Sequence, residues 1–109
     1  MLSKKQGLML TSTVELASEG HEVLVIMATL NDLWEARKWL MEHEIGRNGL
    51  VGDGRVVVYG AWHDVAVAYG QAFDVWVCDE AVTDVSPAWQ EALAVIAARG
   101  RRKTTHASS

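Results

Sequence analysis

The sequence is poor in the residues and runs that mark secreted or membrane-spanning chains. Its one cysteine, Cys78, allows no internal disulfide, and such a chain is typical of a reducing compartment. No apolar run approaches the roughly 20 residues that cross a bilayer. The apolar residues 8–10 are followed at once by Thr11, Ser12 and Thr13, which is too short a run for a signal-peptide core. We therefore expect a cytoplasmic protein without a membrane segment.

The chain also lacks a positive charge balance, because its formal net charge is −4 over 109 residues. This excludes a generally basic, nucleic-acid-binding surface. Half of the residues are hydrophobic and 22% are charged, as in a single globular domain, which we place at residues 1–98. Residues 99–109 form a basic and flexible tail in our prediction. The alternative is that its arginines and lysine bind nucleic acid; they are Arg99, Arg101, Arg102 and Lys103.

Hydrophobic patterning switches repeatedly between helical and strand periods. The strand-like runs do not alternate apolar with polar residues, so both of their faces are expected to be buried, as in a parallel sheet. The fold class predicted is α/β: a small three-layer α/β/α domain with a short, mainly parallel three-stranded sheet. The expected segments are helix 4–19, strand 23–28, a helix from the cap Asn31 to residues 43–45, loop 46–54, strand 55–59, helix 64–69, strand 73–78, and a last helix from the cap Ser86 to Gly100.

Two adjacent carboxylates, Asp79 and Glu80, follow the strand at residues 73–78. In open α/β sheets, ligands bind outside the carboxyl ends of the strands, so these side chains are the first candidates for a catalytic or metal-binding role. The alternative is that they are ordinary loop acids ahead of the last helix, whose N-terminal dipole favours negative charge.

Residues 73–81, which end in Asp79-Glu80-Ala81, resemble the Walker B strand of helicase-like and terminase-like P-loop ATPases. The apolar first helix and residues 17–26 are similar to the helix that follows the phosphate loop and to the next strand of that family. The resemblance covers residues 5–98. It implies that Asp79 holds Mg²⁺ through its water shell and that Glu80 polarises the attacking water.

The front of the sequence departs from that family. The phosphate loop has the pattern G-x-x-x-x-G-K-[ST] after a strand. If the helix from Leu8 matches, Lys5 falls near the position of the loop's lysine, and Gln6 falls where the Mg²⁺-binding Ser or Thr belongs. The strand and the glycines that would cradle phosphates are not in this sequence. We therefore expect no cofactor, with Mg-ATP bound through Lys5 and Asp79 as the alternative.

Other candidate sites rest on fewer residues. His63 and Asp64 follow the second strand, and with Asp79 and Glu80 they could line one edge of the sheet and hold a divalent metal. An exposed loop histidine is the more common situation. Cys78 ends an apolar strand and is expected to be a small core residue.

A three-stranded sheet made of apolar strands has two open edges, and such edges invite pairing with another chain. We expect a homo-oligomer or docking onto a larger protein, through a sheet edge or a helix face that bears tryptophan. The alternative is that the tryptophans cap a small core. The candidate anchors are Trp34, Trp39, Trp62 and Trp89.

The function predicted is that of a non-catalytic interaction or regulatory protein built on a degraded P-loop-like core. Small proteins of this kind can come from phages or mobile elements. One alternative is an ATPase or metal-dependent hydrolase that a partner completes and that uses Asp79 and Glu80. Another is a nucleic-acid-binding accessory protein that uses the basic tail.

Overall fold

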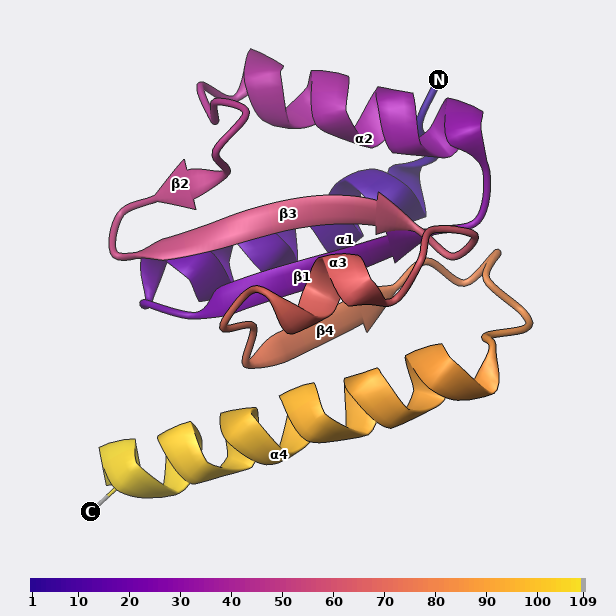
Figure 1. Ribbon diagram of the computed structural model, residues 1–109. Helices are drawn as coiled ribbons and strands as arrows, with labels where there is room; N and C mark the ends of the chain where they lie inside the picture. The colour runs from indigo at the N-terminus through magenta and orange to yellow at the C-terminus, as the bar shows by residue number, and fades with distance from the viewer. Residues whose placement is uncertain (109) are drawn as a thin grey trace.

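The computed structural model describes residues 1–108 of the chain, with their side chains as far as residue 102. Helices and strands follow one another along the chain as the sequence predicts, with one short strand added (Figure 1). The elements are α1 (Lys4–Ser18), β1 (Glu22–Met27), α2 (Leu30–Glu42), β2 (Leu50–Val51), β3 (Gly54–Gly60), α3 (Ala66–Tyr69), β4 (Val75–Cys78) and α4 (Pro87–Ser108).

The sheet has four strands in the order β2-β3-β1-β4. β1 lies between β3 and β4 and runs parallel to both, so the predicted mainly parallel α/β sheet is confirmed. The prediction of three strands missed β2, which pairs antiparallel with the start of β3. β2 lies inside the predicted loop, where Gly49 and Gly52 adopt positive φ angles of 73° and 56° and so let the chain turn back.

The central strand β1 is buried on both faces, as its unbroken apolar sequence predicts. Val23, Val25 and Met27 belong to one hydrophobic cluster with residues of α1 and α2. Leu24 and Ile26 point to the other face and pack with residues of α3 and α4. The sheet therefore separates two layers of helices, and each layer has its own core.

The helix ends agree with the sequence in part. Ser86 caps α4 by accepting a hydrogen bond from the backbone N–H of Trp89 at 3.3 Å, as predicted. Thr29, rather than the predicted Asn31, caps α2: its hydroxyl accepts from the N–H of Asp32 at 3.1 Å.

Gly100 was predicted to end α4, but the helix continues to Ser108. The glycine serves close packing instead, because a Cβ atom at this position would lie 2.3 Å from the carbonyl oxygen of Asp74. The predicted flexibility of residues 99–109 stays a prediction, with Ser109 outside the described residues. No helix within residues 1–108 combines the length and the hydropathy needed to cross a bilayer.

Candidate functional site

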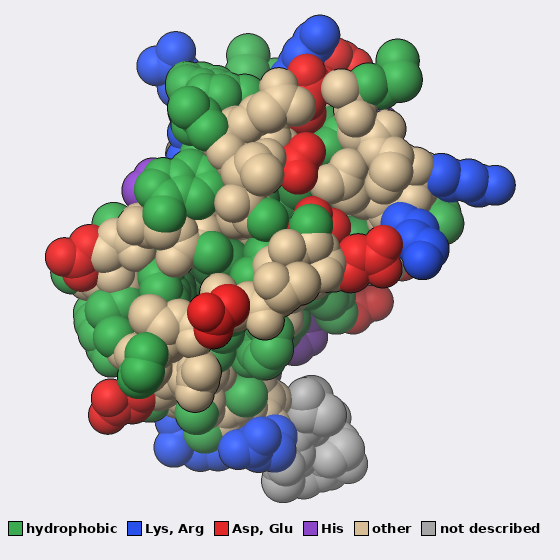
Figure 2. Space-filling model, turned by 90° about the vertical axis from the view of Figure 1, so that its right-hand side faces the viewer, with side chains coloured by type: hydrophobic (Ala, Val, Ile, Leu, Met, Phe, Trp, Pro, Cys, Tyr) green, Lys and Arg blue, Asp and Glu red, His purple; other side chains and the backbone are tan. Residues whose placement is uncertain are grey.

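The candidate site lies where β3, β1 and β4 end, at the right of Figure 1, which is the side of the molecule that faces the viewer in Figure 2. Asp79 is the first residue after β4, and its backbone N–H donates to the carbonyl of Ile26 at 3.0 Å. This bond extends the pairing of β1 with β4 and fixes the direction of the carboxylate. The Asp79 side chain is buried, whereas Glu80 next to it is exposed.

The first turn of α1 reaches this edge and supplies a polar partner to each acid. The Gln6 side-chain amide nitrogen Nε2 donates to Asp79 Oδ2 at 3.1 Å. Lys5 Nζ lies 3.5 Å from Glu80 Oε2, in an exposed ion pair of small energetic weight. Lys5 and Gln6 at the start of α1 therefore lie beside Glu80 and Asp79, which are 75 and 73 positions away in the sequence.

Ser3 sets the orientation of Gln6 through a capping box. The Gln6 N–H donates to Ser3 Oγ at 3.1 Å, and Gln6 Oε1 accepts from the Ser3 N–H at 2.9 Å. With Oε1 held by the cap, the Nε2 hydrogens are aimed at Asp79. The first turn of α1 holds no acidic residue of its own, so Asp79 and Glu80 supply the negative charge that the positive end of this helix favours.

The capping box also affects which backbone N–H groups at the start of α1 are free to bind an anion. The N–H of Gln6 is bonded to the Ser3 hydroxyl, and the N–H of Gly7 donates to the Ser3 carbonyl at 3.0 Å. A phosphate cradle needs several such amides free and pointing at one place. The start of α1 is therefore an ordinary capped helix end.

His63 and Asp64 form hydrogen bonds with nearby backbone groups and with Trp89, and they do not form a group with Asp79 and Glu80. His63 Nδ1 accepts a hydrogen bond from the Gly60 N–H at 2.8 Å. The His63 carbonyl accepts from Trp89 Nε1 at 2.8 Å, and Asp64 Oδ1 accepts from the Ala66 N–H at 2.9 Å. Among the described side chains, no three His, Cys, Asp or Glu residues are grouped closely enough to hold a metal ion. The described structure therefore does not bring His63, Asp64, Asp79 and Glu80 together as such a group.

Cys78 lies at the end of β4 and is partly buried against the core beneath α3 and α4. Burial raises the pKa of its thiol above the ordinary value, and the negative charge of Asp79 next to it raises the pKa further. Because the thiolate is the reactive form, the side chain is expected to be a weak nucleophile at neutral pH.

The pH dependence of Cys78 alkylation measures this effect. We expect the midpoint of the iodoacetamide rate profile to lie above that of an ordinary thiol, and to fall when Asp79 is replaced by asparagine, which has the same shape without the charge. Asp84→Asn, in the same loop, is the control and should leave the midpoint unchanged. Access to the thiol scales the rate but not its midpoint, so an unchanged midpoint in Asp79→Asn contradicts the assignment.

The candidate tryptophan anchors differ in exposure. Trp34 and Trp62 are 59% and 49% exposed, and Trp39 is partly buried with its ring stacked on His43 at 3.8 Å between centroids. Trp89 is only 2% exposed, so it is a core residue and not a surface anchor. The fifth tryptophan, Trp76 on β4, was not among the candidates and is 38% exposed.

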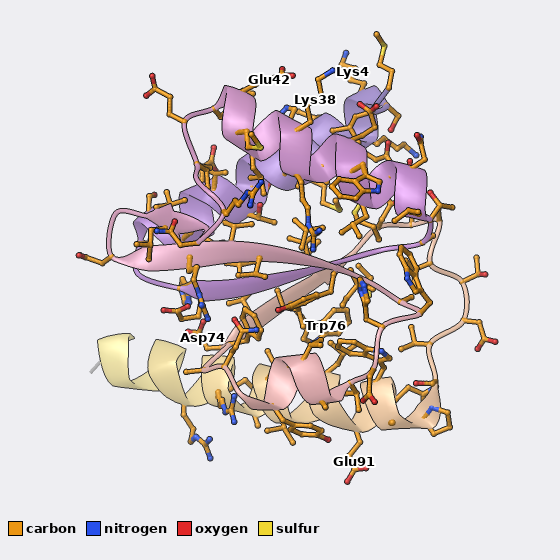
Figure 3. The ribbon with its side chains drawn as sticks, turned by 45° about the horizontal axis from the view of Figure 1, so that its top comes forward. Lys4, Lys38, Glu42, Asp74, Trp76 and Glu91 are labelled. Carbon is orange, nitrogen blue, oxygen red and sulfur yellow. The ribbon has the colours of Figure 1, made fainter. Side chains whose placement is uncertain are left out.

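A polar cluster that the sequence did not predict lies at the opposite, amino end of β4. Buried Asp74 accepts from the Glu22 N–H at 2.8 Å through Oδ1, and its Oδ2 lies 3.0 Å from His21 Nδ1 (Figure 3). Arg55 Nε donates to Glu22 Oε2 at 2.9 Å. The sequence signal for this cluster is an aspartate inside an apolar run, and this signal does not identify the residues that the aspartate contacts. This cluster ties the starts of β1, β3 and β4 together.

The basic residues at the end of the chain do not act as one group. Arg99 is partly buried, and its guanidinium donates to the carbonyl of Phe73 at 3.3 Å, so it belongs to the packing of α4 on the sheet. Arg101 and Arg102 are exposed, and the side chain of Lys103 lies outside the described part. Comparisons with protein-family models, with curated proteins and with solved structures give no match for this chain.

Proposed function

We propose that the chain is a non-catalytic interaction or regulatory protein built on a P-loop-like α/β core. The observation that carries the proposal is the hydrogen bond from Gln6 Nε2 to Asp79 Oδ2 at 3.1 Å. In the family that the sequence resembles, a hydroxyl at the position of Gln6 and the carboxylate at Asp79 share a magnesium ion. Here an amide donor turns its partly positive hydrogens toward the carboxylate, which opposes a cation at the same place.

The start of α1 supports the same proposal. Ser3 occupies the N–H groups of Gln6 and Gly7, so they are not free to bind phosphate. Lys5 alone is a point charge on a flexible, exposed side chain and makes a weak ion pair with Glu80. Neither the cation nor the triphosphate has a prepared site among these residues.

Exposed apolar side chains support an interaction role. A large exposed apolar side chain is common when it stands alone, and ten of them are exposed among the described residues of this chain. They are Met1, Leu8, Leu30, Trp34, Met41, Leu50, Trp62, Tyr69, Trp76 and Val95. Contact with another protein would remove part of this surface from water.

Nucleotide binding and hydrolysis test the proposal together. We expect no thermal shift with 1 mM Mg-ATP, and equal background phosphate release from the wild type and from Glu80→Gln. A ligand at 100 times its Kd stabilises a fold by about 2.7 kcal/mol. In a domain of this size that corresponds to a rise of roughly 10 °C or more in the melting temperature, so binding with a Kd of about 10 µM or tighter would be detected.

A second candidate function is an ATPase that a partner protein completes. It is favoured by the two contacts that bring Lys5 and Gln6 to Glu80 and Asp79. In that case the chain with its partner would release phosphate above background, and Glu80→Gln would abolish the excess. This result would replace the non-catalytic proposal.

A further inference from the structure

The outer edge of β4 is open. β4 is the last strand in the order β2-β3-β1-β4, and no strand in residues 1–108 lies beyond it. Its sequence, Val-Trp-Val-Cys, holds no charge, proline or glycine, the residues that usually protect an edge against pairing. The other edge differs, because β2 has two residues only.

Alternate residues of β4 direct their backbone N–H and C=O groups away from β1. Asp79 donates its N–H to Ile26, and the parallel register aligns Val77 with Val25. Because successive residues of a strand direct their N–H and C=O groups to opposite sides, Val77 and Asp79 face β1. Trp76 and Cys78 therefore direct theirs to the open edge. The matching ligand for two donors and two acceptors in this arrangement is another strand.

The charges at the two ends of β4 favour a second copy of this chain as the partner, with its strand antiparallel to β4. The carboxyl end carries Glu80, whose side chain is 71% exposed. The amino end is flanked by α4, with Arg99 against the Phe73 carbonyl and Arg101 exposed nearby in the same helix. The carboxylates of Asp74 and Glu22 also lie at this end, but Arg55, Arg99 and Arg101 outnumber them. An antiparallel second copy therefore brings its Glu80 to an end of net positive charge at both ends of the pair. A parallel arrangement would instead place ends of like charge side by side.

We propose that two copies of this chain pair through β4 in antiparallel orientation, around a two-fold axis at Val77. In this register Trp76 lies opposite Cys78 of the other copy, and each such pair exchanges two hydrogen bonds. The other symmetric registers place Trp76 or Cys78 opposite itself and satisfy fewer of the outward groups. The inference deepens the proposed function, because it names the first protein that this surface binds.

The register predicts which cysteines can be joined. Opposite residues of a hydrogen-bonded antiparallel pair have Cα atoms about 5.5 Å apart, which suits a disulfide. Trp76→Cys is therefore expected to form a covalent dimer with Cys78 under a mild oxidant. Wild type, with Cys78 alone, and Trp76→Cys combined with Cys78→Ser both leave only diagonal pairs and are expected to stay uncrosslinked.

Light scattering after size exclusion gives the second measurement. At high micromolar concentration the wild type is expected at twice the 12.0 kDa of one chain, and Trp76→Lys, which adds an edge charge, at the monomer mass. Trp34→Lys, a substitution at another exposed tryptophan, should remain dimeric. If Trp76→Lys does not fold, the crosslinking set decides alone.

A wild-type monomer, a dimer that survives Trp76→Lys, or equal crosslinking in all three cysteine variants each overturns the pairing through β4. None of these results bears on nucleotide binding. The proposal of a non-catalytic protein is judged separately by the Mg-ATP experiments.

Discussion

Gly54→Ala is expected to destabilise the fold by about 3 kcal/mol or more, which is a large share of the stability of a domain of this size. A Cβ atom at Gly54 would lie 2.1 Å from the carbonyl oxygen of Ala17 and 2.3 Å from that of His21. Both carbonyls are held in place, because the first accepts from the Gly20 N–H and the second from the Arg55 N–H. The two contacts can be relieved only by moving the start of β3 away from α1 and from the turn that precedes β1.

Urea unfolding followed by tryptophan fluorescence measures this loss. Gly7→Ala is the matched control, because Gly7 lies within α1 with no atom within 4 Å of a Cβ at its position. There the same change should stabilise the protein by about 0.5–1 kcal/mol, as alanine favours a helix over glycine. Equal midpoints for the two variants would show that α1 does not approach β3 this closely.

Trp89→Ala is expected to lower the free energy of unfolding by about 3–5 kcal/mol. The side chain is 2% exposed and packs in the cluster beneath α3 and α4, with Leu24 and Phe73 among its neighbours. Its Nε1 also donates to the carbonyl of His63, which would lose this partner. The substitution therefore opens a cavity and loosens the loop after β3 at the same time.

Two further variants separate these contributions. Trp89→Phe keeps most of the apolar volume and should lose less stability than Trp89→Ala, with roughly 1 kcal/mol of its loss coming from the missing hydrogen bond. Trp34→Ala, at an exposed ring, is expected to stay within about 0.5 kcal/mol of the wild type. A Trp89→Ala protein as stable as Trp34→Ala would contradict the buried position.

The sequence predicts the strands well where the apolar runs are long. Residues 23–28 and 55–59 coincide closely with β1 and β3: β1 is buried on both faces, and β3 alternates buried with partly buried residues. β2 was missed because two residues cannot display a period, and its pairing depends on glycines with positive φ. The predicted end of α4 at Gly100 is wrong, because this glycine allows close approach of the helix to the Asp74 carbonyl and does not end the helix.

In the candidate site too, some features follow from local sequence and others depend on contacts between distant residues. Local sequence placed Asp79 and Glu80 at the carboxyl end of a strand, and that position follows from the strand alone. The contact of Asp79 with Gln6 joins residues 73 positions apart, and no local pattern carries it. For the same reason Trp34 and Trp89 look alike in sequence, since both occur on amphipathic helices, although one is exposed and the other buried.

The place of β1 at the centre of the sheet has a consequence for biosynthesis. Val23 pairs with Val56 on one side and with Val75 on the other, so β1 is synthesised before both of the strands that pair with it. Until β4 emerges from the ribosome, one side of β1 has no strand to pair with. One face of β1 also stays uncovered until α4 has been synthesised. Chains with such long-range pairing fold slowly and benefit from chaperones while they are incomplete.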